Sequence, residues 1–249
     1  ERHTEANPES IRTKLQVCQR CRQMVLDYLE TSQPYRIELI RKNGHYFCRM
    51  TLEETEPVKN VTSQHSLIGI DTNPDGLALT MIARDGNFKK SWWIGNGELT
   101  NSRSKRRRNL IGETVKEAVK VAQTEGVGIV IEDLKFKDDR DLKSKISRKT
   151  HQFAYTRLLR GLEREAARQG VEVIKVNPAY TSIIGRYKYQ KQFGLTVHQS
   201  AALVIGRRGY RHTEKLPKSV RDTLPQKVKE KNKHHWSQWH EANKTIIKL

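Results

Sequence analysis

Apolar positions along the chain predict a run of strands followed by alternating helices and strands. Turn signals at Asn73-Pro-Asp-Gly76 and Arg84-Asp-Gly-Asn87 separate three apolar stretches, as expected for antiparallel strands joined by tight turns. Apolar residues at helical spacing then alternate with two further apolar runs. The predicted strands are 67–71, 76–83, 88–94, 127–132 and 171–176, and the predicted helices are 111–122, 150–169 and 197–208. The order is therefore β-β-β-α-β-α-β-α.

This order resembles the RNase H-like fold, in which an antiparallel meander is followed by strands that return through helical crossovers. In that fold the first strand lies at the centre of the sheet, beside the fourth. We therefore expect an α/β protein with a mixed sheet and flanking helices. Ahead of it, residues 8–31 predict a helix, and 35–43 and 45–53 predict a hairpin turning at Asn43-Gly44. The predicted domains are 1–65, 66–210 and a basic tail, 211–249, which docks on the body or on nucleic acid.

Two apolar runs end abruptly in a carboxylate, at Asp71 and Glu132. Strands that end in acids deliver them to the edge of a sheet, where ligands collect in open α/β folds. His198 opens a helix whose small residues Ser200 to Ala202 allow close packing on the sheet. Two carboxylates within about 4–8 Å and a third ligand, His198, suit the divalent ions that cut phosphodiesters. Each residue also has a purely structural interpretation: Asp71 as a turn former, Glu132 as a salt-bridge partner, and His198 as a core or capping residue. Asp133 competes with Glu132 as the acid of its strand, but its side chain should face the opposite side of the sheet.

A net charge of +19 favours a polyanionic partner, nucleic acid rather than a membrane. No apolar run of 18 residues predicts a membrane span, and no secretion signal is evident, so we expect a cytoplasmic, nucleoid-associated protein. One basic run precedes a helix, and a second segment interleaves aromatic and basic residues, as in loops that stack on bases; the alternative is a solvated surface. The candidate contacts are Arg103, Lys105, Arg106, Arg107, Arg108, Arg186, Tyr187, Lys188, Tyr189, Lys191, Arg207 and Arg208. The pair Trp92-Trp93 is assigned no function.

The chain has three cysteines, too few for a disulfide framework and consistent with a reducing compartment. Cys18 and Cys21 form a C-x-x-C that supplies half of a zinc site. No second pair completes it, so packing as small apolar residues is favoured and no zinc is expected.

Four short motifs, taken together and in order, resemble the RuvC-like nuclease domain of TnpB/OrfB insertion-sequence proteins over about residues 66–210. They are Ile68-Gly-Ile-Asp71, Val130-Ile-Glu132-Asp-Leu134, Asn177-Pro-Ala-Tyr-Thr-Ser182 and His198-Gln-Ser-Ala-Ala202. The resemblance implies a guide-RNA-directed, Mg²⁺-dependent DNA endonuclease with a RuvC-type sheet, and Asp71 and Glu132 as its first two catalytic acids. It also implies that the 35–53 hairpin is the end of a β-barrel (wedge) domain.

The chain departs from this family at two places. Typical members have an aspartate where this chain has His198, and they carry a four-cysteine zinc ribbon where residues 182–195 contain no cysteine. The chain therefore looks like a divergent, ribbon-less TnpB-related subgroup. An imidazole can bind a metal but brings no negative charge, so weaker Mg²⁺ binding or a preference for Mn²⁺ follows.

Two other functions stay open at this point. The first is a nuclease-impaired, RNA-guided DNA-binding or transposition accessory protein, which the histidine at position 198 favours. The second is an unguided, structure-specific nuclease such as a junction resolvase.

Overall fold

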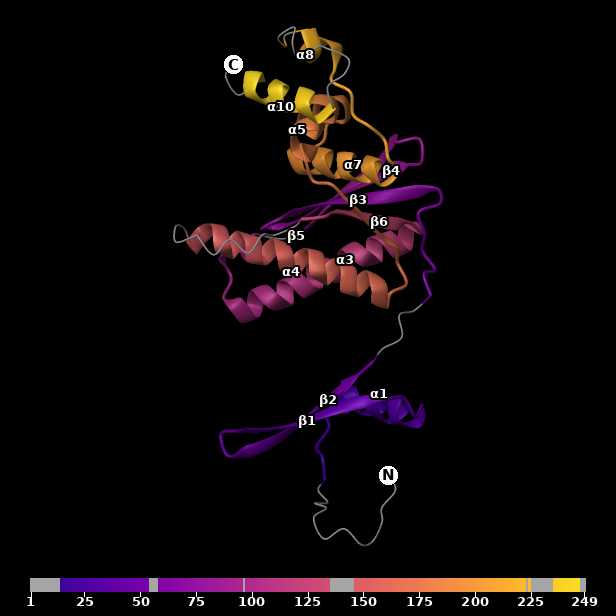
Figure 1. The fold of residues 1–249 in the computed structure, drawn as a ribbon, viewed down its shortest axis with the longest axis vertical. Helices are drawn as coiled ribbons and strands as arrows, with labels where there is room; N and C mark the ends of the chain where they lie inside the picture. The colour runs from indigo at the N-terminus through magenta and orange to yellow at the C-terminus, as the bar shows by residue number, and fades with distance from the viewer. Residues whose placement is uncertain are drawn as a thin grey trace. The chain divides into compact units, whose positions relative to one another are not determined.

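The computed structural model divides the chain into two compact units, 1–55 and 56–249 (Figure 1). The structure describes residues 14–53, 58–95, 97–134, 146–222, 224 and 235–246. The part of the first predicted helix that falls on residues 8–13 lies outside these described residues. Each unit is considered by itself below.

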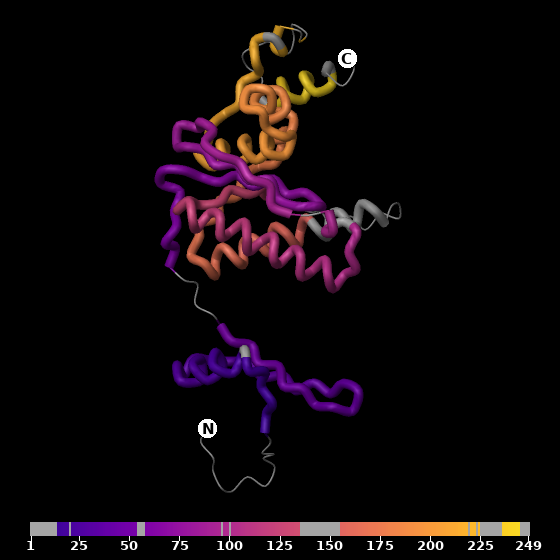
Figure 2. Tube along the Cα trace, turned by 180° about the vertical axis from the view of Figure 1, so that it is seen from behind, coloured from indigo at the N-terminus to yellow at the C-terminus, as the bar shows by residue number. Residues whose placement is uncertain are grey.

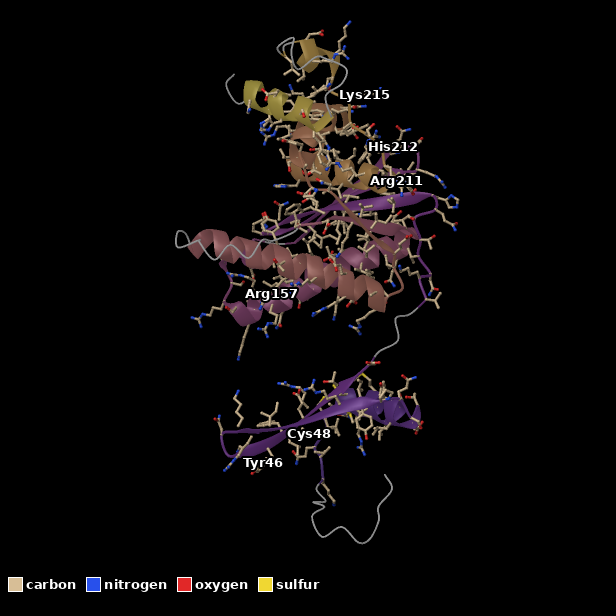
Figure 3. The ribbon with its side chains drawn as sticks, in the orientation of Figure 1. Tyr46, Cys48, Arg157, Arg211, His212 and Lys215 are labelled. Atoms are coloured by element: carbon tan, nitrogen blue, oxygen red, sulfur yellow. The ribbon has the colours of Figure 1, made fainter. Side chains whose placement is uncertain are left out.

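The first unit is one helix and one hairpin. Strand β1 (Tyr35–Lys42) pairs antiparallel with β2 (His45–Leu52), and Asn43 and Gly44 both have positive φ, of 52° and 78°. This turn geometry is typical of a two-residue hairpin, so the hairpin prediction is confirmed. Figure 3 shows two of its side chains, Tyr46 and Cys48. One hairpin does not make a β-barrel, and the wedge assignment stays an expectation.

The helix of this unit, α1 (Gln19–Glu30), is shorter than predicted. Residues 14–18 are not helical, and Leu15 is 57% exposed. Helices of this length depend on packing of an apolar face, and among the described residues of the unit Leu15 is largely uncovered. Cys18 is also exposed, so the expectation that it packs as a small core residue is wrong. Tyr28 ties α1 to the hairpin by donating to the Pro34 carbonyl at 2.9 Å.

The second unit is built on a five-stranded mixed sheet. Its strands are β3 (Ser66–Asn73), β4 (Gly76–Ala83), β5 (Phe88–Gly95), β6 (Gly128–Glu132) and β7 (Val173–Val176). Their order across the sheet is β5-β4-β3-β6-β7. The first three strands are antiparallel, and β6 and β7 run parallel to β3. A meander whose first strand is central and pairs with the fourth is the RNase H-like arrangement, which confirms the predicted fold class.

Helices cover both faces of this sheet (Figures 1 and 2). The long helices α3 (Ser104–Glu125) and α4 (Ile146–Arg168) lie on one face, where they enclose a core with Ile68, Ile70 and Ile129. The opposite face carries α7 (Val197–Gly209) and a second core that includes Leu67 and Val130. The two cores take alternate residues of β3, as the two-residue period of a strand requires. A short helix, α2 (Glu98–Asn101), precedes α3.

Helix α7 lies directly on the central strand because small residues line the contact. A Cβ placed on Gly69 would be 2.0 Å from the Ala202 carbonyl oxygen and 2.4 Å from the Gly206 nitrogen. Thr80 Oγ1 also donates to the Gln199 carbonyl at 2.7 Å. Thr196 begins the helix with a capping box. The predicted close packing of this helix is thus confirmed, and its first turn lies over the end of β3 and the first half of β4.

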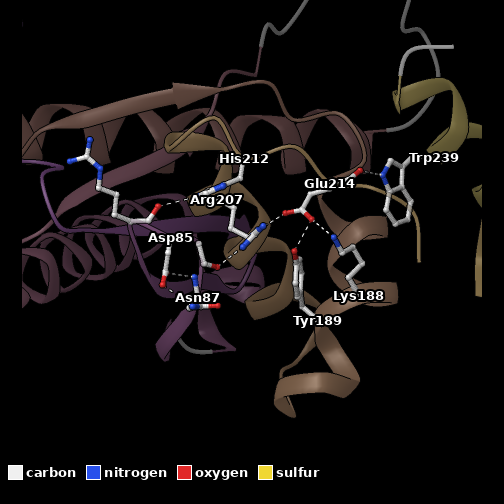
Figure 4. A network of polar contacts seen from close by, with 10 residues as sticks. Asp85, Asn87, Lys188, Tyr189, Arg207, His212, Glu214 and Trp239 are labelled. Carbon is white, nitrogen blue, oxygen red and sulfur yellow. Dashed lines mark hydrogen bonds and ion pairs between the residues drawn. The ribbon is translucent and has the colours of Figure 1, made fainter. Parts of the chain in front are cut away.

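The segment expected to be a basic and aromatic loop is helical instead. It contains α5 (Thr181–Gly185), the π-helical turn η1 (Arg186–Gln190) and α6 (Lys191–Phe193). Tyr189 is 7% exposed, and its hydroxyl donates to Glu214 at 2.7 Å. Lys188 and Arg207 bind the same carboxylate (Figure 4). A buried acid with these partners is satisfied from inside the fold, and this network is the physical reason for the difference.

The described residues after α7 pack against the second core. Leu216, Leu224 and Trp239 are buried, and Trp239 Nε1 donates to the Glu214 carbonyl at 2.8 Å. They include α8 (Lys218–Asp222) and α10 (His235–Ile246). Figure 3 shows Arg211, His212 and Lys215 where the chain leaves α7. Among the described residues, no helix is long and apolar enough to cross a membrane.

Candidate active site on the central strands

Strand register aligns the two candidate acids on one face of the sheet. Gly69 on β3 pairs with Val130 on β6. Two residues further along, at the ends of the same strands, stand Asp71 and Glu132. Residues two apart on a strand share a face, and neighbouring strands lie about 4.8 Å apart. The two acids therefore occupy adjacent positions on the face covered by α7, as the topology predicted.

The same row continues across the meander. Asp71 pairs with Ala78 on β4, and Ala78 pairs with Trp93 on β5. On the other side, Glu132 pairs with Val176 on β7. Four positions, Trp93, Ala78, Asp71 and Glu132, therefore stand side by side across the sheet. We call them the acid row, after its two carboxylates.

Helix α7 brings His198 to Asp71. The His198 Nδ1 atom lies 3.0 Å from Asp71 Oδ2, and Asn73 Nδ2 donates to the same oxygen at 3.1 Å. Asp71 is 8% exposed, while the His198 side chain is 48% exposed. The hydrogen bond to Asp71 raises the pKa of His198 above its usual value, and the charges of Asp71 and Asp75 act in the same direction. The structure therefore joins two of the three predicted site residues directly.

Glu132 has a different environment, in which the neutral carboxyl is favoured. Burial raises its pKa to about 7; a hydrogen bond from Thr181 lowers it, the charge of Asp71 raises it, and the charge of Arg208 lowers it. The Thr181 hydroxyl donates to Glu132 Oε1 at 2.7 Å. A carboxyl with a pKa near 7 changes its charge readily when a cation or a proton donor approaches. Asp133, its neighbour in sequence, is exposed.

Two residues near the acids had no assigned role in the sequence. Thr181 lies in a quoted motif, but its contact with Glu132 depends on the preceding Tyr180, whose φ of 64° turns the chain into α5. Tyr155 lies on α4. Burial raises the pKa of its phenol, and the charges of Asp71, Asp75 and Glu132 raise it further, so the phenol lies close to the acids. No sequence signal reveals this placement, because it depends on where α4 crosses the sheet.

Several predicted nucleic-acid contacts are used inside the protein. Arg208 donates to the backbone carbonyls of Asn177 and Ala179, and its guanidinium lies 6.0 Å from the centre of the Trp236 ring. Together with the Glu214 network, this gives Lys188, Tyr189, Arg207 and Arg208 internal partners. Their polar groups hold the segments around α7 in place, and their predicted contact with nucleic acid stays a prediction.

The run from 103 to 108 begins helix α3 rather than preceding it. Arg106 pairs with Glu98, and Arg107 donates to the carbonyls of Leu99 and Ser102. Besides Arg106, the exposed residues of the two basic segments that were predicted as contacts are Arg103, Lys105, Arg108, Arg186 and Lys191, and Tyr187 is half-buried.

The donor set of the acid row suits a divalent cation only in part. Asp71 and Glu132 offer carboxylate oxygens, the ligands that Mg²⁺ and Mn²⁺ favour. The third predicted ligand, His198, is hydrogen-bonded to one of them. Among the residues that the structure describes, no group of three or more His, Cys, Asp or Glu side chains is arranged to hold a metal ion. Two carboxylates are thus in place, and the described part of the chain supplies no third ligand.

Comparison with known proteins gives structural similarity only. No protein-family model and no curated protein matches the chain. Among solved structures, it is similar to Thermus thermophilus RuvC in complex with a Holliday junction substrate, with 16% identity and a TM-score of 0.40 over 59% of this chain and 94% of that one. Another Thermus thermophilus RuvC structure shows 17% identity and a TM-score of 0.40, over 58% and 94%. The RNase H-like class follows from the strand order and register of the sheet.

Proposed function

We propose that this protein is a divalent-metal-dependent endonuclease that cuts DNA at the acid row. The observation that carries the proposal is the placement of Asp71 and Glu132 side by side at the ends of β3 and β6, with His198 bonded to Asp71. Burying two acids next to each other is costly unless a cation or a proton compensates them. A fold that maintains this arrangement at the ends of its strands gains nothing in stability from it.

The residues of the row have separate roles in this proposal. Asp71 and Glu132 hold Mg²⁺ or Mn²⁺, and Thr181 fixes the orientation of Glu132 through its hydrogen bond. When bound, the ion stabilises negative charge on a phosphate and makes a bound water more acidic. His198 keeps Asp71 in one orientation, and its exposed ring carries a proton to or from the reacting group.

The test is a cleavage assay on labelled DNA with Mg²⁺ or Mn²⁺. Asp71→Asn and Glu132→Gln remove one negative charge each and should abolish cleavage. Asp133→Asn is the matched control, because Asp133 adjoins Glu132 but is exposed. It should cut as the parent does. Cleavage that survives either substitution in the row would overturn the proposal.

Nucleic-acid binding is assigned to the exposed cations at the start of α3. Arg103, Lys105 and Arg108 lie where the helix dipole is positive, so an anion such as a DNA phosphate relieves an unfavourable charge arrangement. Removing one cation that neutralises a phosphate should reduce the slope of log affinity against log salt by about 0.9. Alanine at these three positions should lower the slope, whereas Arg106→Ala, in a side chain paired with Glu98, serves as the control. An unchanged slope in the triple variant would remove these residues from the interface.

RNA guidance of the TnpB type is the finer proposal, and it is supported by the four motifs that resemble that family. In such a protein, backbone contacts hold the nucleic acids and base pairing supplies the sequence specificity. RNA of defined length that co-purifies with the protein and directs cleavage to a complementary target would support guidance. Cleavage of branched DNA without any RNA would favour the unguided nuclease instead.

One observation favours a second function, DNA binding without cleavage. The imidazole of His198 occupies Asp71 Oδ2, and the described residues assemble no three-ligand metal group. In this case the parent protein, supplied with its RNA and target, binds DNA but does not cut it with either metal. The same cleavage assay therefore decides between the two functions.

A further inference from the structure

Trp93 stands at one end of the acid row with much of its side chain exposed. It is 43% exposed although it lies in a strand of the central sheet. Its ring centre is 6.1 Å from that of His198, and the ring planes are inclined by 44°. The exposed indole, next to the His198 ring and on the same face as the two acids, leaves an aromatic surface open to a ligand.

Small residues of the neighbouring strand β4 support one side of the Trp93 ring. A Cβ placed on Gly76 would be 3.0 Å from Trp93 Cζ2, so the indole lies over the bare backbone of this glycine. Its register partner Ala78 is fully buried and presents only a methyl group. An aromatic ring that is already supported on one side loses little conformational freedom when a ligand covers the other side.

The neighbouring Trp92 provides an internal contrast. It alternates with Trp93 along β5, so it faces the opposite side of the sheet, where it packs partly buried against the core under α3 and α4. Of the two adjacent tryptophans, only Trp93 shares a face with Asp71, Glu132 and His198.

We propose that Trp93 is a stacking platform for one unpaired nucleobase of the strand held at the acid row. This inference rests on the proposed function, because it takes nucleic acid as the ligand of the row. The bases of a continuous duplex are covered on both faces by their neighbours, so only an unstacked base can offer its face to the indole. Stacking on aromatic rings tolerates any base. The platform therefore selects single-stranded or locally unpaired DNA, without selecting its sequence.

The test compares two probes that share phosphates but differ in bases. One is a labelled oligothymidylate, and the other is an oligonucleotide of equal length made only of abasic residues. Binding is measured with EDTA present, so that no cleavage occurs. Trp93→Ala should weaken binding of the oligothymidylate by about 5- to 150-fold and leave binding of the abasic probe unchanged. Trp93→Phe should lie between, and Trp92→Phe should match the parent.

The outcomes separate this inference from the proposed function. Equal weakening of both probes by Trp93→Ala would indicate a structural role, and no weakening of either would show that no base stacks there; both results overturn the platform. If the alanine variant fails to fold, the same comparison applies to Trp93→Phe. If Trp93→Ala weakens binding of the oligothymidylate alone but the parent never cuts DNA, only the proposed nuclease function is refuted. If the parent cuts DNA but Trp93→Ala does not distinguish the two probes, only the stacking role of Trp93 is refuted.

Discussion

Replacing Glu132 with glutamine should make the metal-free protein more stable at high pH. Burial raises the pKa of Glu132 from 4.5 to about 7, so the folded state binds a proton more tightly than the unfolded state does. The contribution of Glu132 to stability is complete below pH 4.5 and is lost as the pH rises toward and beyond 7. Each pKa unit corresponds to about 1.4 kcal/mol, so the rise from 4.5 to about 7 gives roughly 3.5 kcal/mol as an upper bound on the loss.

Glutamine is neutral at every pH and keeps the oxygen that accepts from Thr181. Urea unfolding of the parent and of Glu132→Gln should therefore give equal free energies near pH 4. At pH 8 the variant should be more stable by up to roughly 3.5 kcal/mol. Asp133→Asn, an exposed neighbour, should stay within about 0.5 kcal/mol of the parent at both values. A variant that is no more stable at pH 8, or a gain that does not change with pH, would refute this account of Glu132.

Three further predictions concern the contacts of the site and its support. Thr181→Val should raise the pKa of Glu132 further, because it removes the hydrogen bond that lowers this pKa. NMR titration of Glu132 measures the change, and Thr181→Ser, which keeps the hydroxyl, should restore the parent value. His198→Ala should abolish cleavage and leave DNA binding nearly intact, whereas His198→Asp should retain or improve Mg²⁺-dependent cleavage by adding an oxygen ligand; loss of binding in the alanine variant would contradict this. Glu214→Leu, which removes the buried carboxylate that the half-buried Lys188 and Arg207 bind, should destabilise the protein by about 3 kcal/mol in urea unfolding.

Local signals predicted the sheet well because they act over short distances. The turns at Asn73-Pro-Asp-Gly76 and Arg84-Asp-Gly-Asn87 need only a few residues to specify the meander. Once the order of helices and strands indicated the topology, the apolar runs that end at Asp71 and Glu132 could be placed on neighbouring strands, as the structure has them. These elements depend on backbone preference and on burial, and both can be read from the sequence.

The predictions that failed depend on partners distant in the sequence. The segment 180–193 is polar and aromatic in composition, which indicates a loop, but Glu214 supplies a buried acceptor for Lys188 and Tyr189. Composition likewise gave no sign that backbone carbonyls of Asn177 and Ala179 bind the Arg208 guanidinium; the predicted contact of Arg208 with nucleic acid stays a prediction. Such tertiary hydrogen bonds leave no periodic pattern, so sequence composition does not reveal them.

If a divalent ion binds the acid row as proposed, the contacts of the row determine how its affinity responds to pH. The pKa values of both Glu132 and His198 are raised, so both groups hold protons at pH values where an ordinary carboxyl or an isolated imidazole would have released them. A divalent ion that enters the row needs the Glu132 carboxylate, and it must compete with the imidazole for Asp71 Oδ2. Because metal ligands bind in their deprotonated forms, entry of the ion releases these protons. Metal affinity must therefore rise with pH more steeply than a single carboxyl would require.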